Sequence, residues 1–276
     1  MKTIFIAVDF STHSKSIIKY GMALAQAMKA RIVLFHVFQT AVTILEANAL
    51  LNAKELKLTA ENALKKEADD LLSTDNQVIE TIAVEGVTDE MILLYANKYP
   101  NCFIICGMKL EGRLSRSFFG TTVTLLARTS NLPIIIVPEE YEFKNISKIA
   151  LASEFDIDTE TQTLEGLKLI GEAFNSKVLI VRVMETALSV IEEINYRSER
   201  LTLYLKDFKP EFFFPKSNHI TLVLKEFIEE KRVNLLVLIP HHHNLWERIF
   251  IKSETKDMIF NADIPLLILP EIKAQP

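Results

Sequence analysis

Short apolar runs alternate along the chain with longer segments in which apolar side chains recur at helical spacing. The segment from about Ser14 carries Ile17, Gly21, Leu24 and Met28 on one side, which predicts a helix. The intervening runs are apolar and β-branched, which is typical of strands buried on both faces. In the first half we predict strands at 4–9, 32–38, 78–84, 103–106 and 132–137, and further helices at 45–72, after Gly120, and from a Thr88 cap to about Lys98.

The alternation of strands and helices predicts the fold class. Parallel strands that are separated by helices form a sheet covered on both faces, which is a doubly wound, Rossmann-like α/β fold. Ligands of such folds bind beyond the carboxyl ends of the strands, where the strand order switches. Asp9, Val37 and Gly107 lie at the ends of three predicted strands, so we expect them near one crevice.

The pattern occurs twice along the chain. Residues 4–9, 30–37 and 131–138 recur in the same order as residues 149–154, 176–183 and 263–270. Three ordered matches predict a duplicated unit. We therefore expect two domains, at 1–140 and 145–276, each with a five-stranded parallel sheet.

The third strand of the second unit can be placed within its sheet. This run, near residues 211–214, is bracketed by Pro210 and Pro215. Proline lacks the N–H that a central strand would donate, so we place this strand at the sheet edge.

Composition narrows the function classes. The 276 residues include 31 Lys and Arg against 36 Asp and Glu, a net charge of −5 that does not favour a general nucleic-acid binder. No apolar run reaches the roughly 18 residues of a membrane span, and the apolar N-terminal run is too short for a signal peptide. We expect a cytoplasmic protein without membrane contact.

The two cysteines are too few for a disulfide scaffold. Cys102 and Cys106 flank one predicted strand and are therefore about 13 Å apart, whereas a disulfide needs Cα atoms within about 7 Å. We expect two buried thiols.

The stretch from Gly107 to Thr121 carries the strongest chemical signal. It follows a buried strand, precedes a helix and contains three of the seven glycines. A phosphate group binds backbone N–H groups at a helix N-terminus where no side chain obstructs it, which Gly107, Gly120 and Thr121 would provide. Lys109, with Arg113 and Arg116, adds positive charge. The alternative is that these glycines only turn the chain and cap helices.

Histidines give weaker signals. His241, His242 and His243 are adjacent, but consecutive side chains of an extended chain point in opposite directions, so at most two reach one metal ion. A solvated polar loop is the favoured interpretation, and we assign no metal site. His36 ends a strand and is interpreted as a hydrogen-bonded structural residue. The sequence has no Ser-His-Asp order, clear carboxylate pair or HExxH motif, so no catalytic residue is assigned.

Together, the duplicated unit, the Asp9 strand end, the loop from Gly107 to Gly120-Thr121 and the closing run at 131–138 resemble the universal stress protein family over essentially the whole chain. The resemblance implies two tandem Rossmann-like, adenine-nucleotide-hydrolase-like domains. Members that bind ATP have a loop of Gly, two residues, Gly, nine residues, Gly and then Ser or Thr. Here Gly107, Gly120 and Thr121 match that pattern, and Leu110 stands where the second glycine belongs.

The resemblance also implies roles for single residues. Asp9 matches the aspartate that reaches the ribose and adenine, and Val37 matches the residue whose backbone contacts adenine. The implied site is Asp9, Val37, Gly107, Lys109, Gly120 and Thr121, with ATP as ligand and Mg²⁺ accompanying it. The loop of the second domain, at 239–253, contains no glycine, so we expect no ATP binding of this kind there.

Two functions follow from the resemblance and stay open at this point. The first is a stress-response regulatory protein whose N-terminal domain binds ATP or another adenine nucleotide, with weak ATPase activity at most. The second is a protein-interaction module of the same fold that binds no nucleotide, with a partner that the sequence does not identify. Family members commonly dimerise through the final strand, so we expect residues 132–137 and 264–269 to meet near a pseudo-twofold axis within one chain. A homodimer of whole chains is left open.

Overall fold

The computed structural model describes residues 1–40, 46–72, 79–108, 121–139, 141–152, 161–184, 199–240 and 263–270. Within these ranges ten strands form one sheet in the order β3-β2-β1-β4-β5-β10-β9-β6-β7-β8. The first half contributes β1 (Thr3–Ala7), α1 (Ser14–Met28), β2 (Arg31–Phe38), α2 (Glu46–Leu72), β3 (Ile79–Glu85), α3 (Thr88–Ala96), β4 (Cys102–Met108), α4 (Thr121–Thr129) and β5 (Ile134–Pro138). The second half contributes β6 (Lys148–Ala152), η1 (Thr161–Leu164), α5 (Glu165–Phe174), β7 (Lys177–Val181), η2 (Lys206–Phe208), β8 (Glu211–Phe213), α7 (Ile220–Lys231), β9 (Leu235–Leu238) and β10 (Leu266–Ile268).

The two halves repeat the same strand order and register. All neighbouring strands within each half are parallel, in the orders 3-2-1-4-5 and 8-7-6-9-10. Ile4 pairs with Ile32 in the first half, and Ile149 pairs with Val178 at the corresponding place in the second. The fold class predicted from the alternating pattern is thereby confirmed, and β8 lies at the sheet edge as its flanking prolines predicted.

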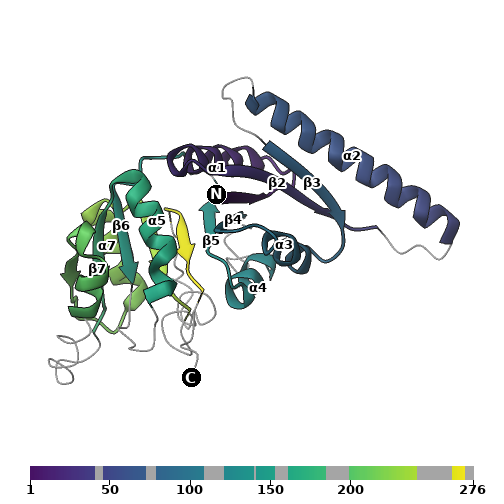
Figure 1. Ribbon diagram of the computed structural model, residues 1–276. Coiled ribbons are helices and arrows are strands. Elements are labelled where there is room, and N and C mark those ends of the chain that lie inside the picture. Colours follow the sequence, from purple (N-terminus) through teal and green to yellow (C-terminus); the bar gives the residue numbers. More distant parts are fainter. Residues whose placement is uncertain are drawn as a thin grey trace, which may run out of the picture.

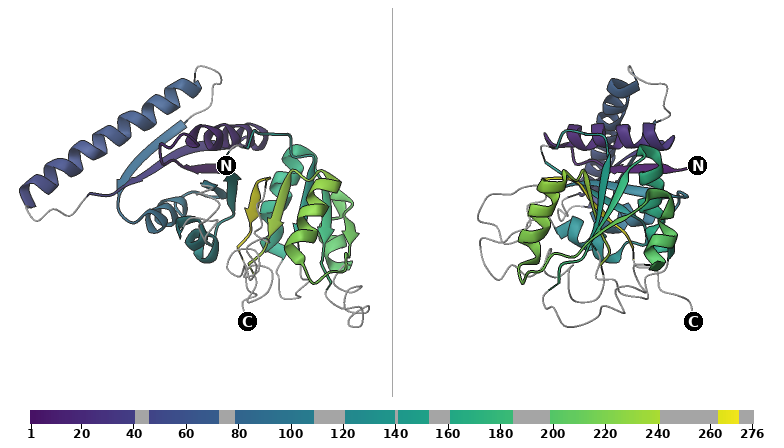
Figure 2. Two further views of the ribbon diagram at one scale, coloured as in Figure 1. Left: turned by 180° about the vertical axis from the view of Figure 1, so that it is seen from behind. Right: turned by 90° about the vertical axis from the view of Figure 1, so that its left-hand side faces the viewer.

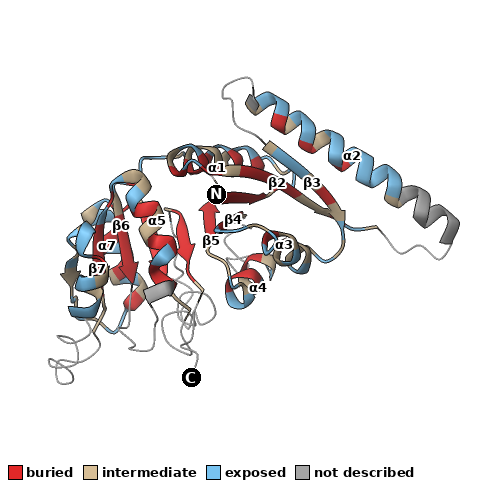
Figure 3. Cartoon of the chain, viewed as in Figure 1, coloured by how far each residue is buried: buried red, intermediate tan, exposed pale blue. Residues whose placement is uncertain are grey.

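Helices cover both faces of the sheet (Figure 1 and Figure 2). Successive residues of β1 point to opposite faces, because Ile4 and Ile6 belong to one hydrophobic cluster and Phe5 to the other. The first cluster includes buried residues of α1, α2 and α5, and the second includes those of α3, α4 and α7. The central strands are therefore almost entirely buried, whereas the described side chains of α2 are buried only along a narrow stripe (Figure 3).

The halves join at the middle of the sheet through β5 and β10. These two strands run antiparallel, with Ile135 opposite Leu267. This is the contact expected at residues 132–137 and 264–269. Because the strands of each half are parallel and the two halves meet antiparallel, the carboxyl ends of β1–β5 point in one direction and those of β6–β10 point in the opposite direction.

Aromatic side chains of the connecting segment pack against α1 and α5. The ring of Tyr20 on α1 lies 6.1 Å from that of Tyr141 and 5.4 Å from that of Phe143. Phe143 in turn lies 6.0 Å from Phe174 on α5. Tyr141 and Phe143, in the segment predicted as a domain boundary, therefore pack against α1, and Phe143 also packs against α5. That the halves are separate domains at 1–140 and 145–276 stays a prediction.

Three local expectations were wrong. Thr88 does not cap α3: it is the first helical residue, and Val87 occupies the cap position with extended backbone and no side-chain hydrogen bond. This helix ends at Ala96 instead of near Lys98. The next residue, Asn97, donates a hydrogen bond from its side-chain amide to the Leu93 carbonyl. Gly107 was expected just after its strand, but β4 continues through Met108 because Gly107 and Met108 still pair with β5.

Cys102 and Cys106 are both buried free thiols on β4, as their spacing predicted. In the described part of the chain, no helix is long and apolar enough to cross a membrane.

Burial raises the pKa of both thiols to about 12. At pH 8 only about one thiol in ten thousand would then be a thiolate, which is the reactive form. We expect the native protein not to react with a disulfide reagent such as DTNB within minutes, and two thiols per chain to react after guanidinium is added. Rapid labelling of the native chain would show that β4 is more open than in this structure.

Helix α1 ends at Met28, and the following residue, Lys29, has a left-handed backbone with φ of 52° and is exposed. Glycine has no penalty in this conformation. We expect Lys29→Gly to raise the free energy of unfolding by about 0.5–1 kcal/mol. Lys19→Gly, the same change at an exposed position inside α1, should lower it by a similar amount. Chemical denaturation measures both, and a loss of stability in Lys29→Gly would contradict the prediction.

Candidate functional site

A pocket of about 430 Å³ lies at the carboxyl ends of the strands of the first half. Its wall is formed by the ends of β1, β2 and β4, the first residues of α1, α3 and α4, and Glu139 after β5. Small-molecule sites in proteins usually measure roughly 300–1,000 Å³. The pocket is large enough for a ligand of nucleotide size, and it lies where the doubly wound strand order predicts a site.

Four of the six predicted site residues line this pocket. Asp9 follows β1, Val37 and Gly107 lie on β2 and β4, and Thr121 begins α4. Lys109 and Gly120, together with Leu110 and the rest of the loop at 109–120, lie outside the described residues. So do the three histidines at 241–243 and most of the second-half loop at 239–253.

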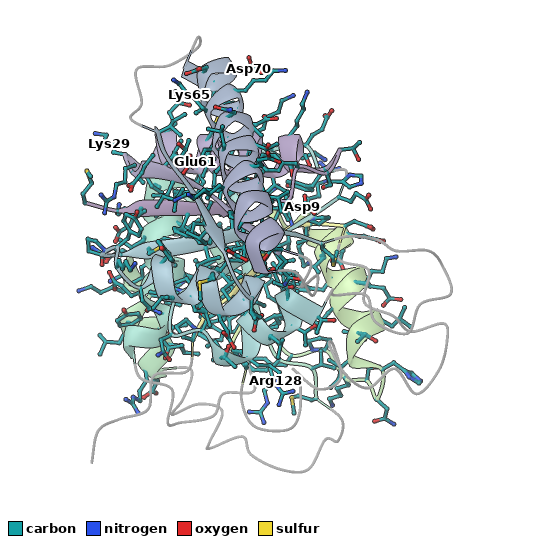
Figure 4. The ribbon with its side chains drawn as sticks, turned by 90° about the vertical axis from the view of Figure 1, so that its right-hand side faces the viewer. Asp9, Lys29, Glu61, Lys65, Asp70 and Arg128 are labelled. Carbon is teal, nitrogen blue, oxygen red and sulfur yellow. The ribbon has the colours of Figure 1, made fainter. Side chains whose placement is uncertain are left out.

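The carboxylate of Asp9 is held by the start of α1. Its Oδ1 accepts hydrogen bonds from the Ser11 backbone N–H at 3.0 Å and from the Ser14 hydroxyl at 2.8 Å. Ser14 is buried as the first residue of α1, whereas Asp9 is exposed. The turn between β1 and α1 thereby fixes the direction of an acceptor group on the pocket wall. Asp9 precedes α1 and Lys29 follows it, and Figure 4 shows the two residues well apart; the pocket lining includes Asp9, Ser11, His13 and Ile17, and therefore lies at the start of this helix.

His36 ties the ends of β1 and β2 together beside Val37. Its Nδ1 lies 2.7 Å from the carbonyl oxygen of Val8, and its ring centroid lies 4.4 Å from that of Phe10. A ring nitrogen that donates to a carbonyl must carry a proton, so this hydrogen bond fixes the tautomer of neutral His36. The geometry agrees with the interpretation of His36 as a hydrogen-bonded structural residue, although the residue also lines the pocket.

Gly107 is needed for a reason that the motif did not reveal. A Cβ atom at this position would lie 2.2 Å from Cδ1 of Ile17 on α1. Gly21 on α1 is as tightly packed, because a Cβ atom there would lie 2.4 Å from Cδ1 of Ile6 on β1. Helix and sheet therefore approach each other closely at two glycines. A side chain at position 107 would therefore have to displace the end of the Ile17 side chain.

His13, Glu139 and Thr88 also line the pocket and were missed by the motif search. His13 precedes α1 and forms an ion pair with Glu139, the residue directly after β5. The rule that identified Asp9, that polar residues after parallel strands face one edge, would also have identified Glu139. Nothing in the sequence indicated that His13 pairs with it.

The floor of the pocket is apolar. Phe35, Ile92, Met108, Val123 and Leu126 are all buried and line it. Cys106 also lines it, and burial keeps its thiol protonated by raising the pKa to about 12. In the described ranges no three His, Cys, Asp or Glu side chains gather in a way that could hold a metal ion. The arrangement suits a flat apolar ring on the floor and polar groups at the rim.

Comparison with known proteins identifies the family. The profile of the universal stress protein family matches residues 1–138, and the chain therefore belongs to this family. The structure of a universal stress protein from Archaeoglobus fulgidus DSM 4304 is similar, with a TM-score of 0.71 at 14% identity, over 98% of this chain and 96% of that one. A functionally unknown protein from Pseudomonas aeruginosa PAO1 has a TM-score of 0.61 at 10% identity, over 98% and 93% of the two chains. No curated protein matches the sequence.

The family match confirms the resemblance seen in the sequence. At identities of 14% and 10% the two solved structures show a shared fold and no more, but they share it over nearly the whole of this chain. What the pocket binds is a separate question.

The packing at Gly107 can be tested without a ligand. Gly107→Ala places a methyl group against Ile17 and should lower the free energy of unfolding by about 1–3 kcal/mol. Ile17→Val removes the Cδ1 atom that clashes. In an Ile17→Val background, Gly107→Ala should therefore lower the free energy of unfolding much less than it does in the wild type. A double-mutant cycle by chemical denaturation measures the coupling. Additive effects would show that Gly107 is not required by this contact.

Proposed function

We propose that the N-terminal half binds ATP or another adenine nucleotide in the pocket at the carboxyl edge, and that the chain acts through this binding as a stress-response regulatory protein. One observation carries the proposal. Asp9, Val37, Gly107 and Thr121 come from four separate places in the sequence, and all four line a single pocket. These positions match the residues of the ATP-binding pattern to which the family resemblance pointed.

The elements around the pocket supply suitable chemistry. Helix α4 begins at Thr121 and is nine residues long, and the first N–H groups of a helix have no partner within it. Such groups bind phosphate well. Asp9 presents an acceptor for ribose hydroxyls, and the buried side chains of the floor suit the adenine ring. Lys109 and Gly120 are proposed to complete the phosphate site, and Mg²⁺ would enter with the phosphates.

The decisive measurement is isothermal titration of the full chain with Mg-ATP, with ADP and AMP as comparisons. We expect saturable binding near one site per chain, because the second-half loop lacks the glycine pattern. Gly120→Leu should abolish it. If none of the three nucleotides produces binding heat, the chain is instead the interaction module that binds no nucleotide. Leu110, in the place of the second glycine, would then account for the loss of nucleotide binding.

A milder substitution tests the address of the site. Asp9→Asn keeps an oxygen that can accept from Ser11 and Ser14 and so preserves the turn, but it removes the charge and replaces the second acceptor by a donor. We expect ATP affinity to fall about tenfold, the size of one lost hydrogen bond to a charged group. Glu226→Ala, which removes an exposed carboxylate on α7, is the matched control. Equal affinity in Asp9→Asn and the wild type would place the nucleotide elsewhere.

A further inference from the structure

The two outer strands of the ten-stranded sheet differ in how well their edges are protected. Strand β8 has three residues and lies between Pro210 and Pro215, and its Glu211 forms an ion pair with Lys177 of β7. Strand β3 has seven residues, contains neither proline nor lysine, and pairs with β2 at every residue without a bulge. Short length, proline, lysine and bulges are the features that keep sheet edges from pairing. Among the described strands, β3 therefore has the edge that a further strand can join.

The hydrogen bonds to β2 determine which backbone groups of β3 face outward. Gly86, directly after β3, donates its N–H to the Phe38 carbonyl oxygen at the end of β2, at 3.2 Å. Because the direction of these groups alternates along a strand, the N–H and C=O groups of residues 80, 82 and 84 face β2. Those of residues 79, 81, 83 and 85 face away from the sheet, where a new strand can bond them.

We propose that β3 pairs antiparallel with the β3 of a second copy of this chain, about a twofold axis at Ile82, and that the two chains thereby form a closed dimer. With the axis at this residue, position 79 lies opposite position 85 and position 81 lies opposite position 83. All four outward-facing residues then form hydrogen-bonded pairs, whereas an axis at residue 81 or 83 leaves part of the strand unpaired. Pairing of β3 with β8, which would build an open filament, is disfavoured because β8 is protected.

The side chains of β3 suit pairing of the strand with itself. Ile82 is half-buried in the single chain and meets its own copy on the axis. Glu80 lies opposite Val84 of the second copy and Glu85 lies opposite Ile79 of the second copy, so no two carboxylates are directly opposed. Like charges directly opposite each other destabilise a strand pair. The twofold register avoids this repulsion, although each strand carries two glutamates.

Helix α2 extends beyond β3 (Figures 1 and 2). Its 27 residues span about 40 Å and the seven residues of β3 about 23 Å. Its buried stripe is Ala60, Leu64 and Ala68, and Leu56, one turn earlier on the same stripe, is 41% exposed. At the antiparallel β5–β10 junction, the equivalent helices α1 and α5 cover the same face. A sheet that continues from β3 into a second copy in this way gives the exposed part of the α2 stripe a surface to pack on.

Sedimentation equilibrium of the full chain between about 1 and 200 µM tests the dimer. We expect the wild type to approach twice 31.5 kDa as its concentration rises. Thr81→Lys brings a lysine of each copy close to the other across the axis, and Thr81→Pro removes an outward N–H but none that bonds β2. Each should raise the dimer dissociation constant at least about tenfold. Thr129→Lys, at an exposed threonine on α4, is the matched control and should leave it unchanged. Thermal unfolding shows whether each variant folds.

Cross-linking tests the register. A residue on the axis, in a pair without hydrogen bonds, has its Cα atom about 4.5 Å from that of its copy, within the range of a disulfide. Ile82→Cys should therefore give a covalent dimer on mild oxidation. Val84→Cys, half-buried on the same face, is the control, because the two copies of residue 84 would be about 13 Å apart. The native thiols of Cys102 and Cys106 are buried and should not contribute.

Three results would overturn the inference. The first is a wild-type chain that stays monomeric at about 200 µM, even if its β3 edge captures an extended peptide of another protein. The second is a dimer that persists in both Thr81 variants, which would place the interface elsewhere. The third is cross-linking of Val84→Cys as readily as Ile82→Cys, which would exclude a twofold axis at Ile82. None of these measurements uses a nucleotide, so their results are independent of the proposed function.

Discussion

Burial of the parallel strands on both faces is the constraint on which the rest of this structure depends. Ile4, Phe5 and Ile6 of β1 are all completely buried, because helices cover the hydrophobic cluster on each face of the sheet. Such strands have no room for polar side chains along their length. Polar and charged groups are therefore confined to the strand ends, and parallel alignment gathers the carboxyl ends of β1, β2 and β4 at one edge. The pocket is a consequence of this arrangement.

The antiparallel pairing of β5 with β10 determines how the two copies of the unit relate. It continues the hydrogen-bonded sheet from one half into the other. The aromatic rings of Tyr20, Phe143 and Phe174 link α1 to α5 through the connecting segment. The same pairing joins residues 134–136 to residues 266–268, where the resemblance to the family led us to expect the two halves to meet. It also separates the two carboxyl edges, so a ligand in the first half would not share a pocket with the second.

Residues of the pocket serve packing and chemistry together. Gly107 allows Ile17 of α1 to lie against β4, and the same glycine stands at the start of the predicted phosphate loop. The start of α1 likewise has two roles, because Ser14 donates a hydrogen bond to Asp9 and the Ser16 hydroxyl contacts the carbonyl oxygens of His13 and Glu139. A substitution at the ligand site is therefore expected to alter the packing of α1, which also contacts Tyr141 of the connecting segment through Tyr20.

The sequence alone indicated most strands and helices of the first half, the repeated pattern, the edge position of the strand near residues 211–214, and four residues that line one pocket. It could do so because two-sided burial, helical spacing and strand-end chemistry are local properties of the chain. Only the tertiary structure decided that Gly107 lies under Ile17, that Thr88 follows the cap of α3, and that His13 meets Glu139. The contacts of Gly107 and His13 depend on how α1 crosses the sheet, and the position of Thr88 depends on the residue at which α3 begins. No periodicity in the sequence records such distances.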